Sequence, residues 1–459
     1  MLKIRNQVGI NSYFFLKIYR KYIRLIIEKY KQLFYNNFGD YMKKVYLCID
    51  LKTFYASVEC VERGLDPFET DLIVADPSRA SGAICLAITP KMKNRGIPNR
   101  CRVYEIPREV KPIVAKPRMK KYIEYAARIY QIYLKYVHVD DIHVYSIDEA
   151  FLDVTDYLHY YHSSEVELAK TIIQDIYQNV GIRATAGIGT NLYLAKIALD
   201  IIAKHEEDGI GYLNEELFQE KLWDYQPLTD FWQIAGGTFR RLQKYHITTM
   251  RDITCTNPSI LYKEFGINAE LLIDHAFGRE SCTIADIKKY RPKAKSFSNS
   301  QILYQDYPAH KAKIVLSEMI DQLVGQLIIQ DYFTSHISVY IGYSKDVIPS
   351  LKYSVSFTTP TRQYTEILRA VLKEYDSRID EGTLIRRIGL SFARLEKTKY
   401  EQLNLFQSME KKERDVQLEK ATYLIRNKFG KNALLKAISY LPGATQKERN
   451  RLVGGHNAE

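Results

Sequence analysis

Two adjacent acidic residues inside a strand-forming run constrain the fold of this chain more than any other feature. Asp148 and Glu149 lie in YSIDEAFLDV, with apolar β-forming residues on both sides. Like charges this close raise each other's pKa, and burial disfavours their ionised forms further. A bound divalent cation removes both penalties, and carboxylate oxygens are ligands that Mg²⁺ prefers. The pattern therefore indicates a metal-binding pair beside a strand, although by itself it also fits a solvated hairpin turn.

A third acid, Asp50, ends an earlier run, KVYLCID at residues 44–50. The run is short, apolar and β-branched, which predicts a buried strand. Neighbouring strands of a ferredoxin-like sheet bring such ends together. Three carboxylates at one sheet position can hold two metal ions, one activating a nucleophilic oxygen and the other carrying a triphosphate. The alternative for Asp50 is a helix N-cap.

The order of predicted elements supports such a sheet. After the first strand, a helix stops at Gly64, and a long helix, a strand–turn–strand unit, a second helix and a further strand and helix follow up to Lys204. This β-α-β-β-α-β order predicts an α/β (α+β multidomain) fold with a ferredoxin-like sheet. Beyond it, IAGGTFRRLQKYHI predicts a helix–glycine turn–helix hairpin, and a second small α/β domain is expected after a basic linker.

The charge balance favours a polyanionic partner. The chain has 66 Lys and Arg against 54 Asp and Glu, a net charge of +12. Basic groups set against phosphates release condensed counterions, so nucleic acid is favoured over an anionic membrane surface. Lys and Arg interrupt the apolar residues 13–35, so no membrane span is expected there. Six scattered cysteines without a C-x-x-C pair indicate a reducing cytoplasm and no zinc site.

Three ordered motifs, IDLKTFYASVE, SIDEAFLDVT and AGIGTNLYLAKIALD, closely resemble the Y-family (translesion) DNA polymerases, in their UmuC/ImpB/MucB/SamB-like branch from Gram-positive bacteria and mobile elements. The resemblance runs through most of residues 44–456 and implies a right-hand polymerase. Its expected parts are a basic N-terminal extension at 1–43, a palm at 44–53 and 117–214, small fingers at 54–116, a helical thumb at 215–285, a basic linker at 286–298, an α/β little finger at 299–397 and a C-terminal tail at 398–459.

The resemblance also implies roles for the acids. Asp50 and Asp148 would bind both Mg²⁺ ions, Glu149 would complete the nucleotidyl-transfer site, and the main-chain carbonyl of Leu51 would be a further ligand. All three acids count as catalytic residues in this reading. Asp153 and Asp156 are expected to be structural.

Further positions are implied to bind the incoming dNTP. Tyr55 matches the steric gate, whose ring would clash with a ribose 2′-hydroxyl, and the backbone of Phe54 would cradle the triphosphate. Lys196 matches a palm lysine that neutralises the triphosphate. Where many relatives carry Tyr-x-x-Arg, this chain has Pro90 and Lys93, and lysine supplies a point charge but not a bidentate fork. Without its motif, Tyr55 would be read as a core aromatic residue.

DNA contacts are expected in the thumb and the linker. The turn around Gly236 and Gly237 resembles a helix-hairpin-helix, in which amides meet a DNA phosphate without reading bases. The basic residues expected to reinforce this grip are Arg240, Arg241 and Lys244 in the thumb and Lys293 and Lys295 in the linker. The alternatives are an ordinary helix hairpin and a solvated linker.

Near the end, the residues Gln402, Leu403, Leu405 and Phe406 of QLNLF resemble the peptide by which bacterial polymerases dock on the sliding clamp. An extended segment of this kind offers two apolar side chains to a groove. The final Gly454-Gly455-His456 resembles the end of the UmuC-like branch, without an assigned chemistry.

The expected function is therefore error-prone translesion synthesis in an SOS-type response to DNA damage, with dNTPs added to a primer 3′-hydroxyl. The expected enzyme is a monomeric, cytoplasmic nucleotidyltransferase that works on primer-template DNA with the sliding clamp. The need for a recombinase filament stays open. Two alternatives are a non-enzymatic DNA- or clamp-binding regulator derived from a polymerase, and a nucleotidyl cyclase that needs no template.

Overall fold

The computed structural model describes residues 44–292, 295–344, 349–397 and 409–459. The chain divides into two compact units, described separately below. The first unit comprises Met1–Phe54 and Ala126–Lys288, and the second comprises Tyr55–Tyr125 and Lys289–Glu459. Within the described ranges, no helix has both the length and the apolarity that crossing a bilayer requires.

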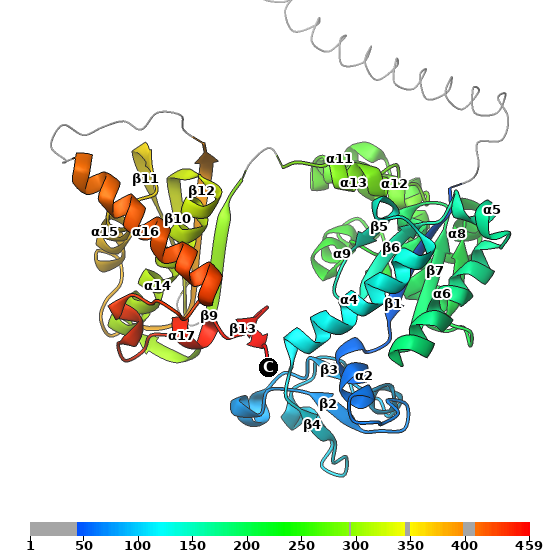
Figure 1. Cartoon of the computed structure of the whole chain (residues 1–459). Coiled ribbons are helices and arrows are strands. Elements are labelled where there is room, and N and C mark those ends of the chain that lie inside the picture. Colours follow the sequence, from blue (N-terminus) through cyan, green and yellow to red (C-terminus); the bar gives the residue numbers. More distant parts are fainter. Residues whose placement is uncertain (1–43, 293–294, 345–348, 398–408) are drawn as a thin grey trace, which may run out of the picture. The chain divides into compact units, whose positions relative to one another are not determined.

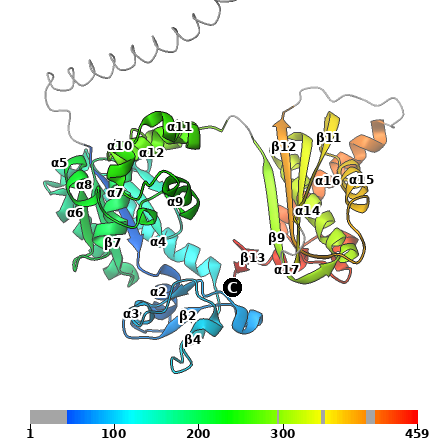
Figure 2. The ribbon, with the colours of Figure 1, turned by 180° about the vertical axis from the view of Figure 1, so that it is seen from behind.

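The first unit contains a five-stranded sheet in the order β5-β6-β1-β7-β8 (Figures 1 and 2). Its strands are β1 (Tyr46–Leu51), β5 (Ile142–Val144), β6 (Glu149–Asp153), β7 (Ala184–Gly189) and β8 (Ile210–Leu213). The first four have the antiparallel order of a ferredoxin-like fold, which confirms the predicted fold class. Strand β8 pairs parallel with β7 and was not predicted.

Helices around this sheet follow from local sequence signals. Helix α4 (Met119–Tyr136) begins in the second unit and ends in the first, and α5 (Tyr157–Tyr161) precedes α6. Helix α6 (Glu165–Val180) begins at a capping box of Ser164 with Glu167 and ends at Gly181, whose φ of 75° suits glycine.

Helix α7 (Leu192–Ile197) lies directly on strand β7. At Gly187 an added Cβ would overlap the backbone of Ala195 and Leu199, so only glycine permits this close approach. The helix then continues as a π-helical segment, Ala198–Ala203. Such segments insert an extra residue into a helix and are frequent at functional sites.

The rest of the first unit is helical, as expected for residues 215–285. Its helices are α8 (Glu215–Leu222), α9 (Gly236–Gln243), α10 (Met250–Cys255), α11 (Pro258–Phe265), α12 (Asn268–Ala276) and α13 (Ile284–Lys289). They share a buried core with α7, which includes Tyr193, Phe218 and Phe231.

The expected helix–glycine turn–helix hairpin and the expected start of the linker both differ from the structure. The glycines at 236 and 237 open helix α9 instead of forming a turn between two α-helices. Helix α13 extends into the expected linker at 286–298.

The second unit begins with most of helix α2 (Phe54–Val61), which starts at the last residue of the first unit. A small sheet in the order β3-β2-β4 follows, with β2 (Leu72–Val74), β3 (Ala87–Ile88) and β4 (Ile113–Ala115). Strand β4 lies between Pro112 and Pro117. Helix α3 (Pro90–Asn94) starts with proline at its first position, where the missing N–H costs nothing.

A four-stranded sheet in the order β11-β10-β12-β9 forms the larger part of the second unit. Its elements are β9 (Phe297–Pro308), α14 (Ala309–Gln330), β10 (Phe333–Tyr343), β11 (Leu351–Thr361), α15 (Tyr364–Asp376) and β12 (Leu384–Glu396). Apolar side chains of α14 and α15 pack on the sheet and form one core. The expected helix–strand alternation between residues 299 and 395 is observed.

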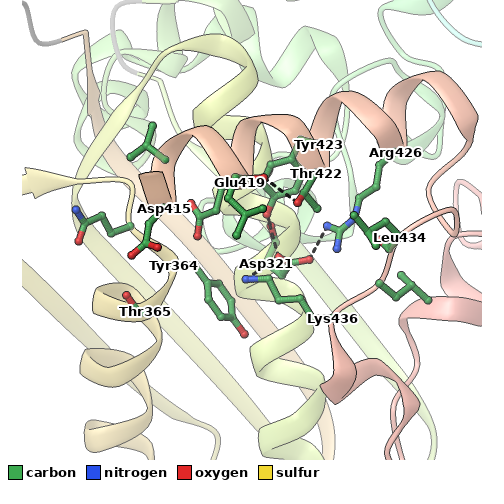
Figure 3. A pocket seen from close by; sticks show the side chains of 14 residues that line it. Asp321, Tyr364, Thr365, Asp415, Glu419, Thr422, Tyr423, Arg426, Leu434 and Lys436 are labelled. Carbon is green, nitrogen blue, oxygen red and sulfur yellow. Dashed lines mark hydrogen bonds and ion pairs between the residues drawn. The ribbon is translucent and has the colours of Figure 1, made fainter. Parts of the chain in front are cut away.

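Residues 409–459 do not form a separate tail, as had been expected for residues 398–459. Helix α16 (Met409–Phe429) packs on α14, where the buried Asp321 accepts a hydrogen bond from Arg426 (2.7 Å) and another from the Tyr423 hydroxyl (Figure 3). A second buried acid of α14, Glu318, accepts the backbone N–H of Thr445 at 2.8 Å. Two carboxylates of one helix therefore hold the C-terminal segment on this unit.

The final glycines have a conformational role. Gly454 and Gly455 have φ of 59° and 83° and join the short strands β13 (Leu452–Val453) and β14 (His456–Asn457). A two-residue hairpin turn with positive φ at both central positions strongly favours glycine.

Candidate active site

Strand pairing brings the three predicted acids to one end of the first sheet. Asp50 on β1 lies directly opposite Glu149 on β6 in the antiparallel register. The backbone N–H of Leu51 donates to the carbonyl of Asp148 at 2.9 Å. Residues about 100 positions apart in sequence thus meet because β1 and β6 are neighbours.

The electrostatics of Asp50 reflect this convergence. Burial raises the pKa of Asp50 to about 7; the positive charge of Lys204 opposes the shift, while Asp148 and Glu149 add to it. A carboxyl with this pKa is partly protonated at neutral pH, mainly because burial disfavours its ionised form, and the two neighbouring acids add to that effect.

Asp148 and Glu149 are held by neighbours that the sequence reasoning did not single out. The hydroxyl of Ser146 donates to Asp148 Oδ1 at 2.6 Å, and the thiol of Cys48 donates to Glu149 Oε1 at 3.2 Å. Burial raises the pKa of the Cys48 thiol well above its usual value, and Glu149 adds to the shift. Cys48 therefore acts as a neutral donor that orients Glu149.

The donor set suits a hard divalent cation. Its side chains are carboxylates, the ligands from which Mg²⁺ sites are built. Within the described ranges, no three His, Cys, Asp or Glu side chains are already arranged as metal ligands. Glu149 is instead turned toward Lys196 and Cys48. The acids fit the ion, and Glu149 would have to share Oε2 or turn to reach it.

Lys196 bridges two acids. Its Nζ lies 2.9 Å from Glu149 Oε2 and 3.0 Å from Asp200 Oδ2, and only 9% of its side chain is exposed. Burial disfavours its charge, but Glu149, Cys48 and Asp200 outweigh burial, and the pKa of Lys196 is raised. In this structure its ammonium group is paired with both acids. The predicted contact of Lys196 with a triphosphate would compete with these two ion pairs.

Lys204 is a second cation of this site, and the sequence reasoning missed it. It follows the π-helical segment, its side chain is 46% exposed, and it pairs with Asp200 at 2.8 Å. Its charge also acts on Asp50. An exposed lysine beside the acids is better placed than Lys196 to receive an anionic ligand. A local signal was present in the sequence: Lys204 lies four positions after Asp200, the last residue of the AGIGTNLYLAKIALD motif, which is the spacing of a helical ion pair.

The turn between β1 and α2 carries backbone strain. Thr53 has a φ of 48°, which is unusual for a β-branched residue. Such outliers persist where the surrounding structure imposes them and are frequent at ligand sites. Phe54, the next residue, is buried with 2% exposure.

In the second unit, Tyr55 is half-buried, and its ring stacks on that of Tyr122 with centroids 4.5 Å apart. Lys93 is exposed on α3. On the same helix Lys91 donates to the carbonyl of Glu69, and the following Arg95 pairs with Asp71 at 3.0 Å. Of the two predicted dNTP-binding residues of this unit, Lys93 therefore has the more exposed side chain.

The predicted DNA contacts differ in availability. Gly236 and Gly237 are exposed, and no side chain caps the first amides of α9. Arg240 is exposed and its guanidinium lies beside Gly236. Arg241 is paired with Glu264 at 2.8 Å and stacked over Phe265, so its predicted phosphate contact would compete with these interactions.

Two further lysines predicted to contact DNA phosphates, Lys244 and Lys295, have partners within the protein. Lys244 lies 3.6 Å from the same Glu264, and Lys295 donates to the hydroxyl of Tyr332 at 2.5 Å. Residues outside the described ranges are Lys293 and the clamp-like positions Gln402, Leu403, Leu405 and Phe406.

Comparison with known proteins identifies similar families and folds. Residues 49–200 match the impB/mucB/samB family, and residues 294–405 match the C-terminal domain of that family. The "Putative UV-damage repair protein UvrX" of Bacillus subtilis is 32% identical over 92% of this chain and 100% of its own length. A "DNA polymerase IV 2" of the same organism is 29% identical over 90% of this chain and 99% of its own length.

A solved structure has a similar fold. A Y-family DNA polymerase chimera aligns with a TM-score of 0.60, covering 77% of this chain and 100% of the chimera, at 21% sequence identity. The similarity extends over most of both chains and supports the multidomain α/β architecture described above.

Proposed function

Because this chain belongs to the impB/mucB/samB family of Y-family DNA polymerases, we propose that it is an error-prone translesion polymerase that extends a primer 3′-hydroxyl past damaged template bases. The observation that carries the proposal is the meeting of Asp50, Asp148 and Glu149 at one end of the sheet, with the pKa of Asp50 raised to about 7. A cluster of this kind has little structural value, since its charges repel one another.

The acids would hold two Mg²⁺ ions, with Asp50 and Asp148 shared by both, and with Glu149 and the carbonyl of Leu51 completing the set. When bound, the ions would lower the pKa of the primer hydroxyl and neutralise charge on the triphosphate. Ser146 and Cys48 would keep Asp148 and Glu149 oriented through their hydrogen bonds. Catalysis would then rest mainly on positioning and on charge neutralisation.

Nucleotide binding would use the cations and the turn after β1. Lys204 would neutralise the triphosphate, with Lys196 acting mainly on Glu149 and Lys93 adding a point charge. The backbone at Thr53 and Phe54 would cradle phosphate oxygens, and Tyr55 would exclude a ribose 2′-hydroxyl. The roles of Phe54, Tyr55 and Lys93 follow from the family resemblance, which gives triphosphate neutralisation to Lys196; the role of Lys204 rests on its exposure and its ion pair with Asp200.

Primer-template DNA would be held by phosphate contacts. The uncapped amides of α9 at Gly236 and Gly237, with Arg240 beside them, suit a backbone phosphate. Residues Lys293 and Lys295 would follow the duplex backbone. The segment Gln402–Phe406 would dock on a sliding clamp, as its sequence suggests.

The regulator alternative predicts binding without synthesis. All three acids and Lys196 are present, although a regulator has no need for them. A role in an SOS-type response belongs to the same proposal, and adding a recombinase filament to the reaction below tests whether one is needed.

The test is primer extension on undamaged and abasic templates with Mg²⁺ and dNTPs. Wild type should add nucleotides only with template and metal, and Asp148→Ala should reduce addition by about 10³-fold or more, the scale of losing a main charge-stabilising group. Asp156→Ala, an exposed acid whose side chain makes no helix-capping hydrogen bond, should retain wild-type activity. Folded wild type that binds primer-template but adds nothing, even with clamp and recombinase, would replace the polymerase by the regulator.

A further inference from the structure

The second unit contains a buried carboxylate that the proposed chemistry does not use. Glu59, on helix α2, has 0% exposure. Arg118 holds it with two hydrogen bonds, from Nε to Oε1 and from Nη2 to Oε2, both at 2.9 Å. Arg63 also donates to Oε2. Burial would raise the pKa of Glu59, but the hydrogen bonds from Arg118, Arg63 and Tyr122 outweigh burial and lower it.

This anchored carboxylate fixes one aromatic ring. The hydroxyl of Tyr122 donates to Glu59 Oε1 at 2.8 Å, and Tyr122 has 0% exposure. A ring buried on all sides and bonded at its tip has little freedom to rotate or tilt. The bidentate pair of Arg118 with Glu59 sets the position of that tip.

The fixed ring forms the surface against which Tyr55 lies. The two rings stack with centroids 4.5 Å apart and an interplanar angle of 18°. Aromatic contacts at this spacing favour a defined relative orientation. Tyr55 and Glu59 also lie four positions apart on α2. Tyr122 is therefore connected to this helix twice, by its hydrogen bond to Glu59 and by its stacking on Tyr55.

We infer that Tyr122, held by Glu59 and Arg118, is a positioning residue that fixes the ring of Tyr55 and thereby sets discrimination against ribonucleotides. The inference rests on the proposed function, in which Tyr55 is the steric gate. A gate rejects one extra oxygen atom only if its ring cannot yield, because the clash is relieved by a small rotation. The stacked and anchored Tyr122 ring removes that rotation on one side.

The experiment measures kcat/KM for single dNTP and rNTP insertions opposite the same template base and takes their ratio. Tyr122→Leu removes the stacking ring and should lower the dNTP-to-rNTP preference by about 3- to 10-fold, the worth of an aromatic pair. The loss should come from improved rNTP insertion, with kcat/KM for dNTP changing less. Tyr55→Ala should lower the preference further.

Two milder variants keep the inference testable if Tyr122→Leu fails to fold. Tyr122→Phe retains the ring but loses its hydrogen bond to Glu59. Glu59→Gln keeps Tyr122 and weakens the acceptor of that bond. Each variant should lower the dNTP-to-rNTP preference by about 2-fold, the lower end of the free energy of one hydrogen bond. The control is Tyr375→Leu, another buried tyrosine of the second unit, whose hydroxyl donates to the carbonyl of Ala309 at 2.9 Å. It should lose stability without changing the preference.

The outcomes separate the inference from the proposed function. A normal preference in folded Tyr122 variants, with Tyr55→Ala relaxed, overturns the inference and leaves the polymerase intact. An equal fall in Tyr375→Leu also overturns it, because general destabilisation would then explain the effect. Wild type that inserts no nucleotide at all contradicts the proposed function itself.

Discussion

Burial raises the pKa of Asp50 to about 7, with Lys204 opposing the shift and the acids Asp148 and Glu149 adding to it. The ordinary pKa of an aspartate is 3.8. At pH values between 3.8 and about 7, the folded protein therefore keeps a proton on Asp50 that the unfolded chain has released. This carboxyl therefore contributes stability at low pH, and the contribution is lost as pH rises through about 7. A bound cation would compensate the charge.

The first prediction concerns this titration. In EDTA, the free energy of unfolding of wild type should fall as the pH rises from 5 to 8. The fall should be roughly 1–3 kcal/mol larger than that of Asp50→Asn. A rise in pKa from 3.8 to about 7 sets an upper limit of ~4 kcal/mol. Mg²⁺ should reduce the difference at pH 8. Urea unfolding of both proteins measures it, and identical pH dependence in the two would contradict the assigned pKa.

The second prediction separates the two lysines. Lys196→Met leaves Glu149 without its buried cation and should lower the free energy of unfolding by about 3–5 kcal/mol, as breaking a buried pair does. Lys204→Met, at an exposed position, should change stability by less than about 1 kcal/mol but raise KM for dNTP by about tenfold. Thermal melts and steady-state kinetics decide this. A raised KM confined to a folded Lys196 variant would restore the original assignment of Lys196.

At the scale of elements, close contacts between helices and their neighbours depend on single glycines. Helix α16 packs on α14 where Gly325 faces the ring of Tyr423, and an added Cβ would lie far inside van der Waals contact with that ring. The same Tyr423 donates to Asp321, which also binds Arg426 (Figure 3). Sterics and charge thus hold α16 in one position.

The third prediction tests this docking. Gly325→Ala should lower the free energy of unfolding by about 1–3 kcal/mol, the usual cost of overpacking, despite the better helix propensity of alanine. Gly382→Ala, where an added Cβ meets nothing within 4 Å, is the matched control and should be near neutral. Equal stability of the two variants in urea titrations would show that α16 does not depend on this contact.

At the scale of the whole molecule, the net charge of +12 predicts DNA binding with a strong salt dependence. Not every positive charge is equally available to DNA: in helix α9, Arg240 is exposed, whereas Arg241 is paired with Glu264. Net charge therefore indicates the class of partner, while ion pairing determines which residues contact it.

The fourth prediction uses this pair. Arg240→Ala should make the slope of log K against log salt less negative by about 1 for primer-template DNA, the value for one lost phosphate contact. Arg241→Ala should leave the slope unchanged but lower stability, because it removes the contacts with Glu264 and Phe265. Fluorescence anisotropy at several salt concentrations gives both slopes. A larger change for Arg241→Ala would reverse the assignment.

The amino-acid sequence by itself determined the family, the fold class and the three acids. Motif order and strand patterning are local properties, and β1 and β6 could be predicted as neighbours because the ferredoxin-like order has few alternatives. Local signals also mark helix α6, because a capping box of Ser164 with Glu167 begins it and Gly181 ends it.

Only the tertiary structure decided how deeply each charge is buried and which partners it has. Lys196 and Lys204 are eight residues apart, yet Lys196 is buried between Glu149 and Asp200, whereas Lys204, after a π-helical segment, is about half exposed and pairs with Asp200. No local pattern encodes this difference, because burial and ion pairing depend on which distant residues the fold brings into contact. The docking of residues 409–459 through Glu318 and Asp321 was missed for the same reason: a polar, charged sequence looks solvated until its partners are known.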